Sequence, residues 1–476
     1  MQTRLFIGGK WAGTAVMHAV RNPFTAEEIA RVSFGDESTL DYAITAAHAA
    51  FPTARAIPAH QRAELLQRVA HGIENRRAEF VALIVGEAGK PITYAEAEVA
   101  RAVFTFTFAA EEARRWNGAS GEVLPLDAMP AGAGHIGFSR RFPIGVISAI
   151  TPFNFPLNLV AHKVAPCIAT GNTMVVKPAA KTPLTALLLA EVLAEAGVPA
   201  GQVNFVTCSN EHAARLVTDE RVAMISFTGS PDVGWPLKAL AGKKRVCLEL
   251  GGNAGVIVHA DADIAAAVPL IVTGGFSYAG QSCISVQRIF VHEEIYADFK
   301  IRLVAHIRDK VKMGDPRARD TVVGPMITAE ALAKTRALIA SAVTAGGRVV
   351  IGGEMRGHCL EATVLEDVPL SHEACTGELF APVVTLHRYG AFDEALRLVN
   401  DSRFGLQAGI FTNDIRRAAG AFEALDVGGV LINQVPTWRV ENTPYGGIRD
   451  SGFGREGLRY AMEEMTEIKT LIIRNS

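Results

Sequence analysis

The sequence predicts an α/β protein whose core is a parallel, doubly wound sheet covered by helices on both faces. After Ile144, five short β-rich runs alternate with helical stretches, which is the pattern of such a sheet. A second α/β stretch follows, and 476 residues are enough for two or three domains. The β-rich runs are 146–150, 173–176, 203–206, 223–227 and 245–250, and the helical stretches are 157–169, 183–196, 211–217 and 233–240.

The segment before this sheet is predicted to be mainly helical as far as about Asn117. Apolar residues recur at helical spacing between positions 65 and 73, and Gly-Lys-Pro at 89–91 ends the next helical stretch. Residues 93–116 form another helical run. Residues 121–142 contain Pro and Gly and have no helical period, so the pattern breaks there.

The second α/β stretch is predicted from helices at 264–278 and 294–310 and strands at 289–292, 381–386, 409–412 and 429–432. Glycines 446, 447, 452 and 454 then mark a loop. Residues 467–474 are predicted to form a terminal strand. Such a strand is an exposed edge in a monomer, which invites pairing with another subunit.

The composition indicates an enzyme of a reducing, cytoplasmic compartment. Lys and Arg (47) nearly balance Asp and Glu (49), which gives no support to a nucleic-acid or membrane partner. No apolar run reaches the length of about 18 residues that a membrane span needs, and no secretory signal is visible. Six scattered cysteines without a CxxC pair suit neither a disulfide scaffold nor a metal site.

Cys283 and Glu249 are candidates for a nucleophile and a base. Cys283 follows Gly-Gln-Ser, whose small and polar side chains leave the sulfur reachable, although most free cysteines are merely small core residues. Glu249 ends a buried strand just before two glycines. A half-buried carboxylate holds its proton more tightly and suits a general base, but a strand-end Glu can equally pair with a basic residue.

Further candidates follow the other strands of the first sheet. Asn154 lies between two prolines and two aromatic residues, where a fixed amide can stabilise an oxyanion, although most such residues are ordinary turn asparagines. Lys177 ends one strand. Residues 227–230 (PheThrGlySer) end another and open a helix whose N-terminus suits a pyrophosphate. No GxGxxG is present, so the usual dinucleotide fingerprint is missing.

Taken together, these motifs resemble the aldehyde dehydrogenase superfamily over nearly the whole chain. The matching segments are ThrProPheAsnPhePro at 151–156, ValLysPro at 176–178, PheThrGlySer at 227–230, LeuGluLeuGlyGlyAsn at 248–253, GlyGlnSerCys at 280–283, GlyGluLeuPheAlaPro at 377–382, and ProTyrGlyGly through SerGlyPheGlyArgGlu at 444–456.

The resemblance implies a mechanism. The Cys283 thiolate attacks the aldehyde, and the Asn154 amide holds the oxyanion. Hydride passes to the nicotinamide, and water activated by Glu249 hydrolyses the thioester to a carboxylic acid. Relatives that form acyl-CoA commonly lack the glutamate, so its presence favours hydrolysis. Glu456 matches a glutamate proposed as a proton relay.

The resemblance also implies an NAD or NADP site. Lys177 and Glu378 match ribose contacts, Ser230 with Gly229 the pyrophosphate contact, and Phe380 a neighbour of the nicotinamide. NAD-specific relatives often carry a glutamate where this chain has Ala180, followed by Lys181, so NADP should at least be tolerated. The remaining predicted cofactor contacts are Ile150, Thr151, Pro152 and Phe153.

The predicted substrate is a small polar aldehyde of the lactaldehyde, glyceraldehyde or semialdehyde type. Asn158 and His162 lie four and eight residues after Asn154, on one helix face. Succinate-semialdehyde relatives often have Arg at the position of His162, and that activity remains an alternative. Trp438 and Arg439 can supply a wall and a cation, although an interface salt bridge explains Arg439 equally well. Phe155 completes the predicted pocket.

The family fold implies a Rossmann-type nucleotide-binding domain (1–120 and 143–250), an α/β catalytic domain (251–449), and a β oligomerisation arm with the C-terminal segment (121–142 and 450–476). A homodimer or homotetramer is expected. A cysteine esterase without a nucleotide is the rival function, but it leaves the motifs at 227–230 and 377–380 unused.

Overall fold

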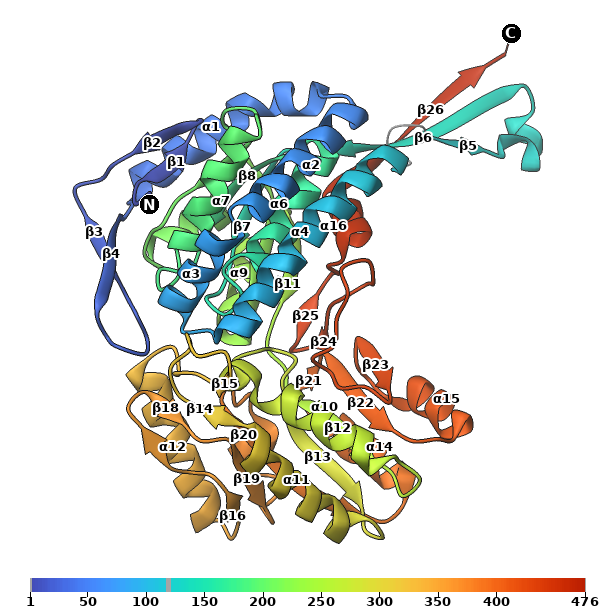
Figure 1. The fold of residues 1–476 in the computed structure, drawn as a ribbon. Coiled ribbons are helices and arrows are strands. Elements are labelled where there is room, and N and C mark those ends of the chain that lie inside the picture. Colours follow the sequence, from blue (N-terminus) through green and yellow to red (C-terminus); the bar gives the residue numbers. More distant parts are fainter. Residues whose placement is uncertain (1, 117–120, 476) are drawn as a thin grey trace.

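A computed structural model of the protein describes residues 2–116 and 121–475. Two large sheets, one of eight strands and one of seven, form two halves of the molecule. In Figure 1 the halves lie one above the other, and an arm that ends at the C-terminus projects from the upper half. The predicted α/β class is confirmed.

The upper sheet contains the five predicted parallel strands in the order β9-β8-β7-β10-β11. The strand order reverses between β7 and β10, and such a reversal opens a crevice at the carboxyl ends of the strands. Antiparallel strands extend the sheet at both sides. The strands are β1 Leu5–Ile7, β2 Lys10–Ala12, β7 Val146–Ile150, β8 Thr173–Lys177, β9 Val203–Phe205, β10 Val222–Thr228, β11 Arg245–Glu249 and β25 Gly452–Phe453.

Helices cover this sheet because its central strands are apolar on both faces; every residue of β7 and β8 is buried. The buried Glu87 carboxylate accepts the backbone N–H groups of Leu184 and Thr185, which fixes the start of α7. The helices are α1 Glu37–Ala56, α2 Ala59–Asn75, α3 Arg77–Ala88, α4 Ile92–Arg115, α6 Asn158–Thr170, α7 Leu184–Glu195, α8 Arg215–Thr218, α9 Pro231–Leu240 and α16 Leu458–Glu464.

The lower sheet has the order β16-β19-β20-β13-β12-β22-β23 and is parallel except at β16. Its strands are β12 Ala254–Val258, β13 Val286–His292, β16 Arg348–Ile351, β19 Thr363–Glu366, β20 Val383–Tyr389, β22 Gln407–Phe411 and β23 Gly429–Ile432. Its helices are α10 Ile264–Phe276, α11 Tyr296–Lys310, α12 Ala329–Thr344, α13 Glu373–Thr376, α14 Phe392–Asn400 and α15 Ile415–Ala424. Short two-stranded pairs join β14 Lys312–Met313 to β15 Thr321–Val323, β17 Met355–Arg356 to β18 Cys359–Leu360, and β21 Phe404–Gly405 to β24 Ile448–Arg449.

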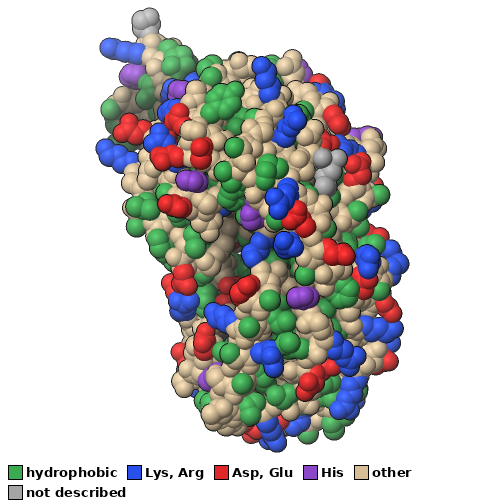
Figure 2. Space-filling model, turned by 90° about the vertical axis from the view of Figure 1, so that its left-hand side faces the viewer, with side chains coloured by type: hydrophobic (Ala, Val, Ile, Leu, Met, Phe, Trp, Pro, Cys, Tyr) green, Lys and Arg blue, Asp and Glu red, His purple; other side chains and the backbone are tan. Residues whose placement is uncertain are grey.

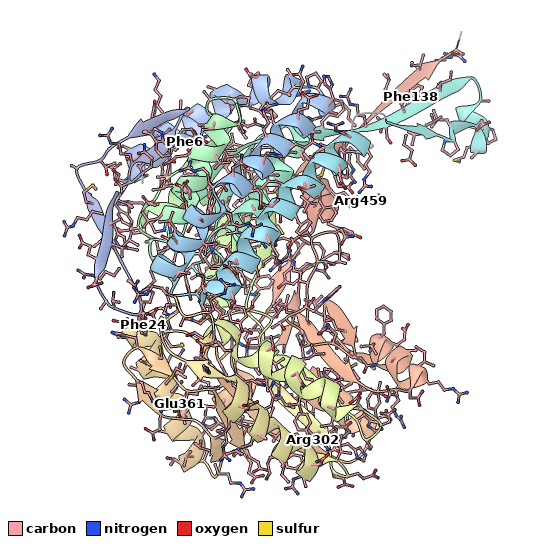
Figure 3. The ribbon with its side chains drawn as sticks, in the orientation of Figure 1. Phe6, Phe24, Phe138, Arg302, Glu361 and Arg459 are labelled. Carbon is pink, nitrogen blue, oxygen red and sulfur yellow. The ribbon has the colours of Figure 1, made fainter. Side chains whose placement is uncertain are left out.

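The projecting arm is a three-stranded sheet of β5 (Glu122–Leu124), β6 (His135–Pro143) and β26 (Thr466–Arg474). The predicted terminal strand pairs with β6 along its whole length and is an edge strand. Figure 3 marks Phe138 on the arm, away from both halves. Apolar side chains exposed on the arm are Val123, Ile136, Phe138, Ile468, Leu471, Ile472 and Ile473.

The sequence patterns missed the strands at the N-terminus. Before α1 the chain forms β1, β2 and the hairpin of β3 (Met17–Arg21) and β4 (Glu28–Ser33), where a mainly helical segment was predicted. These strands are short, so local periodicity carries little signal for them. The predicted helix 264–278 ends earlier, at Phe276. Asn117, the expected end of the helical segment, lies outside the described residues.

Candidate active site

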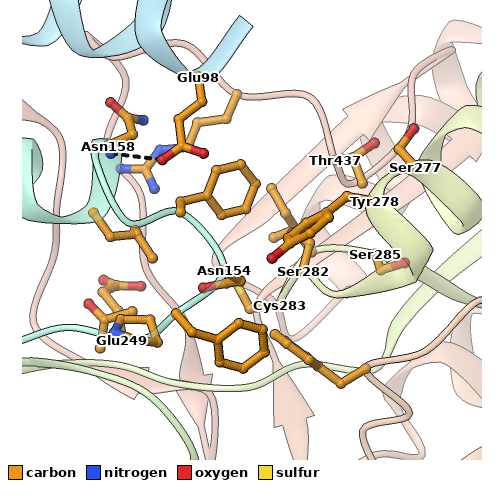
Figure 4. A pocket seen from close by; sticks show the side chains of 18 of the residues that line it. Glu98, Asn154, Asn158, Glu249, Ser277, Tyr278, Ser282, Cys283, Ser285 and Thr437 are labelled. Carbon is orange, nitrogen blue, oxygen red and sulfur yellow. Dashed lines mark hydrogen bonds between the residues drawn. The ribbon is translucent and has the colours of Figure 1, made fainter. Parts of the chain in front are cut away.

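A cavity of about 470 Å³ lies at the boundary between the upper and lower halves. Figure 2 shows the surface hollowed between the two halves of the molecule. The upper half contributes α4, the loop after β7, α6 and the end of β11, and the lower half contributes residues 273–285 and the loops around Phe380 and Arg439. Cys283, Glu249 and Asn154 all line this cavity, and Figure 4 shows them around one space.

Cys283 follows a tight turn. Tyr278, Ala279 and Gly280 all have positive φ, which L-residues with side chains rarely adopt. A Cβ at Gly280 would lie 2.1 Å from the carbonyl oxygen of Ala381, so only glycine fits there. This turn leaves Cys283 half-buried in the cavity, whereas the other five cysteines are buried.

The environment of the Cys283 sulfur favours the protonated thiol. Burial raises the pKa of Cys283 to about 12, and the carboxylates of Glu378 and Glu249 act in the same direction. The Tyr445 hydroxyl oxygen lies 3.3 Å from the sulfur. Tyr445 and the guanidinium of Arg439 counteract the increase in the pKa.

Asn154 joins the loop after β7 to the turn that carries Cys283. Its side-chain N–H donates to the carbonyl oxygen of Gln281 at 3.1 Å. Its side-chain oxygen is buried, with no hydrogen-bond partner among the described residues. Where this loop ends, the backbone N–H groups of Leu157 and Asn158 donate to the carboxylate of Glu98 on α4, which fixes the start of α6.

Glu249 ends β11 and points into the same space. Both carboxylate oxygens are buried and find no hydrogen-bond partner in the described part of the chain. Burial first, and then the negative charge of Glu456, raise the pKa of Glu249 well above its usual range. The carboxyl group therefore holds a proton more tightly than an exposed glutamate does, which suits a general base.

The predicted nucleotide contacts gather at the carboxyl ends of the parallel strands. Lys177 is buried and its amino group donates to the side-chain oxygen of Asn210 at 3.1 Å. Ser230 precedes α9, and its side chain makes no capping hydrogen bond to the helix start. The hydroxyls of Thr151 and Thr228 are buried without a partner among the described residues. Ile150 ends β7, Gly229 and Pro152 line the cavity, and Ala180 lies beside the exposed Lys181.

Three further predicted nucleotide contacts, Glu378, Phe153 and Phe380, also line the cavity. Glu378 accepts the backbone N–H of Gly252 at 3.0 Å, and burial raises the pKa of Glu378 to about 7. The rings of Phe153 and Phe380 meet edge to face, with centroids 5.8 Å apart. Phe380 has a φ of 48°, a strained backbone conformation at the cavity wall.

A network of buried charged side chains lies at the distal end of the cavity. His162 Nε2 lies 2.5 Å from a carboxylate oxygen of Glu441 and 3.2 Å from the Asn158 amide nitrogen. Arg101 binds the other Glu441 oxygen at 2.9 Å. These charges lower the pKa of Glu441 far below its usual range, even though burial acts in the opposite direction.

The network continues through the carboxylate of Glu456. One of its oxygens lies 3.1 Å from Lys163 Nζ, and the other lies 3.4 Å from Arg439 Nη2. Lys163, His162 and Arg439 together hold the pKa of Glu456 well below its usual range, despite burial. Arg439, at 6 % side-chain exposure, lies inside this network rather than in a surface salt bridge. Trp438 is 48 % exposed and is not among the residues that line the cavity, whereas Phe155 is.

The sequence patterns did not single out Tyr445, Glu441, Arg101 or Lys163. Arg101 lies on a helix far from the other motifs, and Glu441 follows Arg439 by two residues, a spacing with no recognisable signature. Tyr445 was visible only as a member of the segment 444–456. Among the described residues no cluster of His, Cys, Asp or Glu suits a metal ion, and no described helix is long and apolar enough to cross a membrane.

Comparison with known proteins agrees with this geometry. The model of the aldehyde dehydrogenase family matches residues 11–471. The chain belongs to the aldehyde dehydrogenase family. This aldehyde dehydrogenase is 38% identical to the 3-sulfolactaldehyde dehydrogenase of Priestia aryabhattai over 473 residues, which cover 99% of this chain and 98% of that protein.

Two solved structures share the fold of this aldehyde dehydrogenase. Aldehyde dehydrogenase 21 from Physcomitrella patens, in complex with its reaction product succinate, has a TM-score of 0.96 at 43% identity and covers 99% of this chain and 98% of its own. Glyceraldehyde-3-phosphate dehydrogenase GapN from Methanocaldococcus jannaschii, complexed with NADP, has a TM-score of 0.92 at 38% identity. The match covers 97% of this chain and 100% of the GapN chain. The protein is an oxidoreductase that acts on aldehydes and uses NAD or NADP.

Proposed function

We propose that the enzyme oxidises a small polar aldehyde to its carboxylic acid through a thioester on Cys283. The observation that carries this proposal is the single cavity lined by a reachable sulfur, a buried amide and a buried carboxylate without partners. Few other reactions need a nucleophile, an oxyanion donor and a water-activating base together beside a nucleotide crevice.

In the first step the Cys283 sulfur attacks the aldehyde carbon and forms a thiohemiacetal. The Asn154 side-chain N–H, which now donates to the Gln281 carbonyl, turns to the developing oxyanion, together with the backbone N–H of Cys283. Both donors belong to segments held by buried hydrogen bonds. The backbone of both segments therefore stays in place, and only the Asn154 side chain has to turn when the charge develops.

The crevice of the upper sheet fits a dinucleotide, because it offers two unpartnered threonine hydroxyls and an uncapped helix start. Bound NAD⁺ or NADP⁺ supplies the hydride acceptor for the oxidation of the thiohemiacetal. We assign the pyrophosphate to Ser230 and Gly229, the ribose groups to Lys177 and Glu378, and the nicotinamide side to Phe153 and Phe380. The remaining walls of the proposed nucleotide site are formed by Ile150, Thr151, Pro152 and Ala180.

Glu249 takes a proton from water, which then attacks the thioester carbon and releases the acid and the Cys283 sulfur. Its raised pKa gives the carboxylate the affinity to accept that proton. Glu456 is the assigned relay that passes the proton away, and it contacts Lys163 and His162. A cysteine esterase would need the same groups but no nucleotide crevice.

The distal end of the cavity supports a polar substrate. It is lined by four polar or charged side chains: His162, Asn158, Arg101 and Arg439. Among the residues predicted to form the substrate pocket, Phe155 is the one aromatic residue that lines the cavity. The three relatives are named for 3-sulfolactaldehyde and glyceraldehyde-3-phosphate or contain succinate, which are small and anionic molecules. A succinate-semialdehyde-type activity is the second candidate, favoured by the succinate in the Physcomitrella enzyme.

We also propose that NADP is accepted, because Ala180 puts no negative charge beside the adenosine ribose and Lys181 adds a positive one. The apolar side chains exposed on the arm support a homodimer or homotetramer in which β26 or the arm face is covered. The domains proposed are nucleotide-binding (1–120, 143–250), catalytic (251–449), and arm with C-terminal segment (121–142, 450–476).

The test is an aldehyde panel run with NAD and NADP in parallel, followed as growth of the reduced-nicotinamide absorbance. Short hydroxylated aldehydes and carboxylate semialdehydes should give the highest kcat/KM, with activity on both cofactors. A preference for long alkyl or bulky aromatic aldehydes contradicts the substrate assignment. Ester hydrolysis without any nucleotide-dependent oxidation contradicts the reaction itself.

A further inference from the structure

Tyr445 contacts the reacting sulfur, yet no step of the proposed mechanism uses it. Its hydroxyl oxygen lies 3.3 Å from Cys283 Sγ, and its side chain is buried against Ile284 and Leu406. A hydroxyl buried against apolar side chains needs a polar partner. Here the partner is the atom that attacks the substrate.

The backbone holds Tyr445 in this position. Its N–H donates to the carbonyl oxygen of Glu456 at 3.0 Å, and the Glu456 N–H donates back to the Tyr445 carbonyl oxygen at 2.7 Å. This bridge closes the loop from 445 to 456 at its two ends. The bridge therefore fixes the backbone from which the Tyr445 ring extends toward the sulfur.

Glu456, the other residue of this bridge, also binds the Arg439 guanidinium that lies over the Tyr445 ring. The Arg439 guanidinium carbon lies 3.6 Å from the centroid of the Tyr445 ring, and Arg439 Nη2 lies 3.4 Å from a Glu456 carboxylate oxygen. A cation over the face of a phenol withdraws electron density from the ring, which makes the hydroxyl a stronger hydrogen-bond donor. Glu456, in turn held by Lys163, keeps the guanidinium in place.

We propose that Tyr445 is a catalytic residue whose hydroxyl donates a hydrogen bond to the Cys283 thiolate, and that Arg439 is a positioning residue that strengthens this bond through its contact with the face of the ring. This inference rests on the proposed role of Cys283 as the nucleophile. It explains how a thiolate is maintained in a site that otherwise disfavours it.

Most of the surroundings of the Cys283 sulfur destabilise its thiolate, so the thiolate needs a hydrogen-bond donor. Burial raises the pKa of Cys283, and the carboxylates of Glu378 and Glu249 face the sulfur and raise it further. Tyr445 and Arg439 are the neighbours that lower it. Burial also raises the pKa of Tyr445, so the phenol keeps its proton. Because a thiolate carries no proton, the hydroxyl must be the donor.

The experiment measures how fast iodoacetamide labels Cys283 in the full-length enzyme without substrate, as a function of pH, by mass spectrometry of the peptide that contains Cys283. Tyr445→Phe keeps the ring and its stacking but removes the hydroxyl. It should raise the pKa for labelling by about 1, so that labelling at pH 8 slows about tenfold. Tyr389→Phe is the matched control, because it removes a buried hydroxyl that bonds to His259 instead. This control should leave the labelling profile unchanged.

Arg439 gives the second arm of the test. Arg439→Met should raise the labelling pKa in the same direction, and Arg439→Lys, which keeps a cation, should raise it less. This arm decides the question if Tyr445→Phe fails to fold. A labelling pKa that stays at the wild-type value in folded Tyr445→Phe, or in Arg439→Met, overturns the proposal.

Failure of the proposed function would look different. If Cys283→Ser retained full aldehyde oxidation, the nucleophile assignment would be wrong, while the labelling profiles would still report whether the hydrogen bond exists. If Cys283→Ser is inactive and the labelling pKa does not respond to Tyr445→Phe, only the role of Tyr445 fails.

Discussion

The two ends of the active-site cavity differ in how their carboxyl groups are partnered. At the reacting end, the Asn154 side-chain oxygen and both Glu249 carboxylate oxygens are buried without partners in the described residues. At the distal end, Glu441 is bonded to both His162 and Arg101. The pKa values diverge accordingly, since that of Glu249 is raised and that of Glu441 is lowered.

From this difference we expect the end with the unpartnered carboxylate to perform the chemistry and the end with the paired carboxylate to hold the shape of the cavity. A buried polar group without a partner costs free energy, and a folded protein keeps that cost where a substrate or water will supply the partner. A paired network in a medium of low dielectric constant is rigid and selects a complementary ligand. We therefore expect substitutions at the reacting end to affect turnover, and those at the distal end to affect stability and substrate affinity.

The largest expected effect is that of Cys283→Ala. Removing the sulfur should lower kcat by at least about 10⁴-fold, because no other cysteine is among the described residues that line the cavity. Steady-state oxidation of the best aldehyde measures the loss, and Cys375→Ala, a buried cysteine far from the cavity lining, is the control. Comparable activity in Cys283→Ala would place the chemistry elsewhere.

Glu249→Gln should lower steady-state turnover by about 10²–10⁴-fold, the usual contribution of a general base. The thioester should still form, so rapid mixing should show one equivalent of reduced nicotinamide per site followed by a slow phase. In the wild type, hydrolysis should accelerate as the pH rises through the raised pKa of Glu249, and this rise should vanish in the variant. Unchanged steady-state turnover would remove Glu249 from the mechanism.

Glu441→Gln tests the distal end. It leaves His162 and Arg101 without their carboxylate, so the free energy of unfolding should fall by about 1–3 kcal/mol and KM should rise more than kcat falls. Because the pKa of Glu441 is lower in the folded state, its contribution is complete above the unfolded pKa near 4.5 and is lost as the pH falls through the folded pKa. Urea unfolding at several pH values measures this, with the exposed Glu423→Gln as the control.

The smallest expected effect is on the stability of Glu249→Gln. The pKa of Glu249 is raised on folding, so the wild type loses stability as the pH rises above the ordinary carboxyl range. A neutral glutamine avoids that loss, and the variant should therefore be at least as stable as the wild type at pH 8 while being far less active. A clear loss of stability would mean that Glu249 is part of a structural network like that of Glu441.

Much of the fold was predictable because each central strand is identified by the residue types of a few neighbouring positions. The run at 146–150 is apolar except for Ser148, and the structure places the central strand β7 at these residues. The N-terminal strands β1 to β4 were missed because they are short: β1 and β2 have three residues each, and β3 and β4 have five and six. Short edge strands have neither length nor strict alternation.

The same distinction applies to the site. Cys283, Glu249 and Asn154 stand in segments with recognisable neighbours, so a single chain identifies them as candidates without any contact information. The roles of Tyr445, Arg101 and Glu441 depend on distances between segments that are far apart in the chain. Arg101 and Glu441, for example, are separated by 340 positions.

The amino-acid sequence alone determined the fold class and which side chains can react, because residue type and local period are properties of neighbouring positions. Only the tertiary structure decided which of those groups have partners. Burial, charge and hydrogen bonding around Cys283 and Glu249 arise from five or more segments meeting in one cavity, and the energy of each ionised group depends on that whole environment.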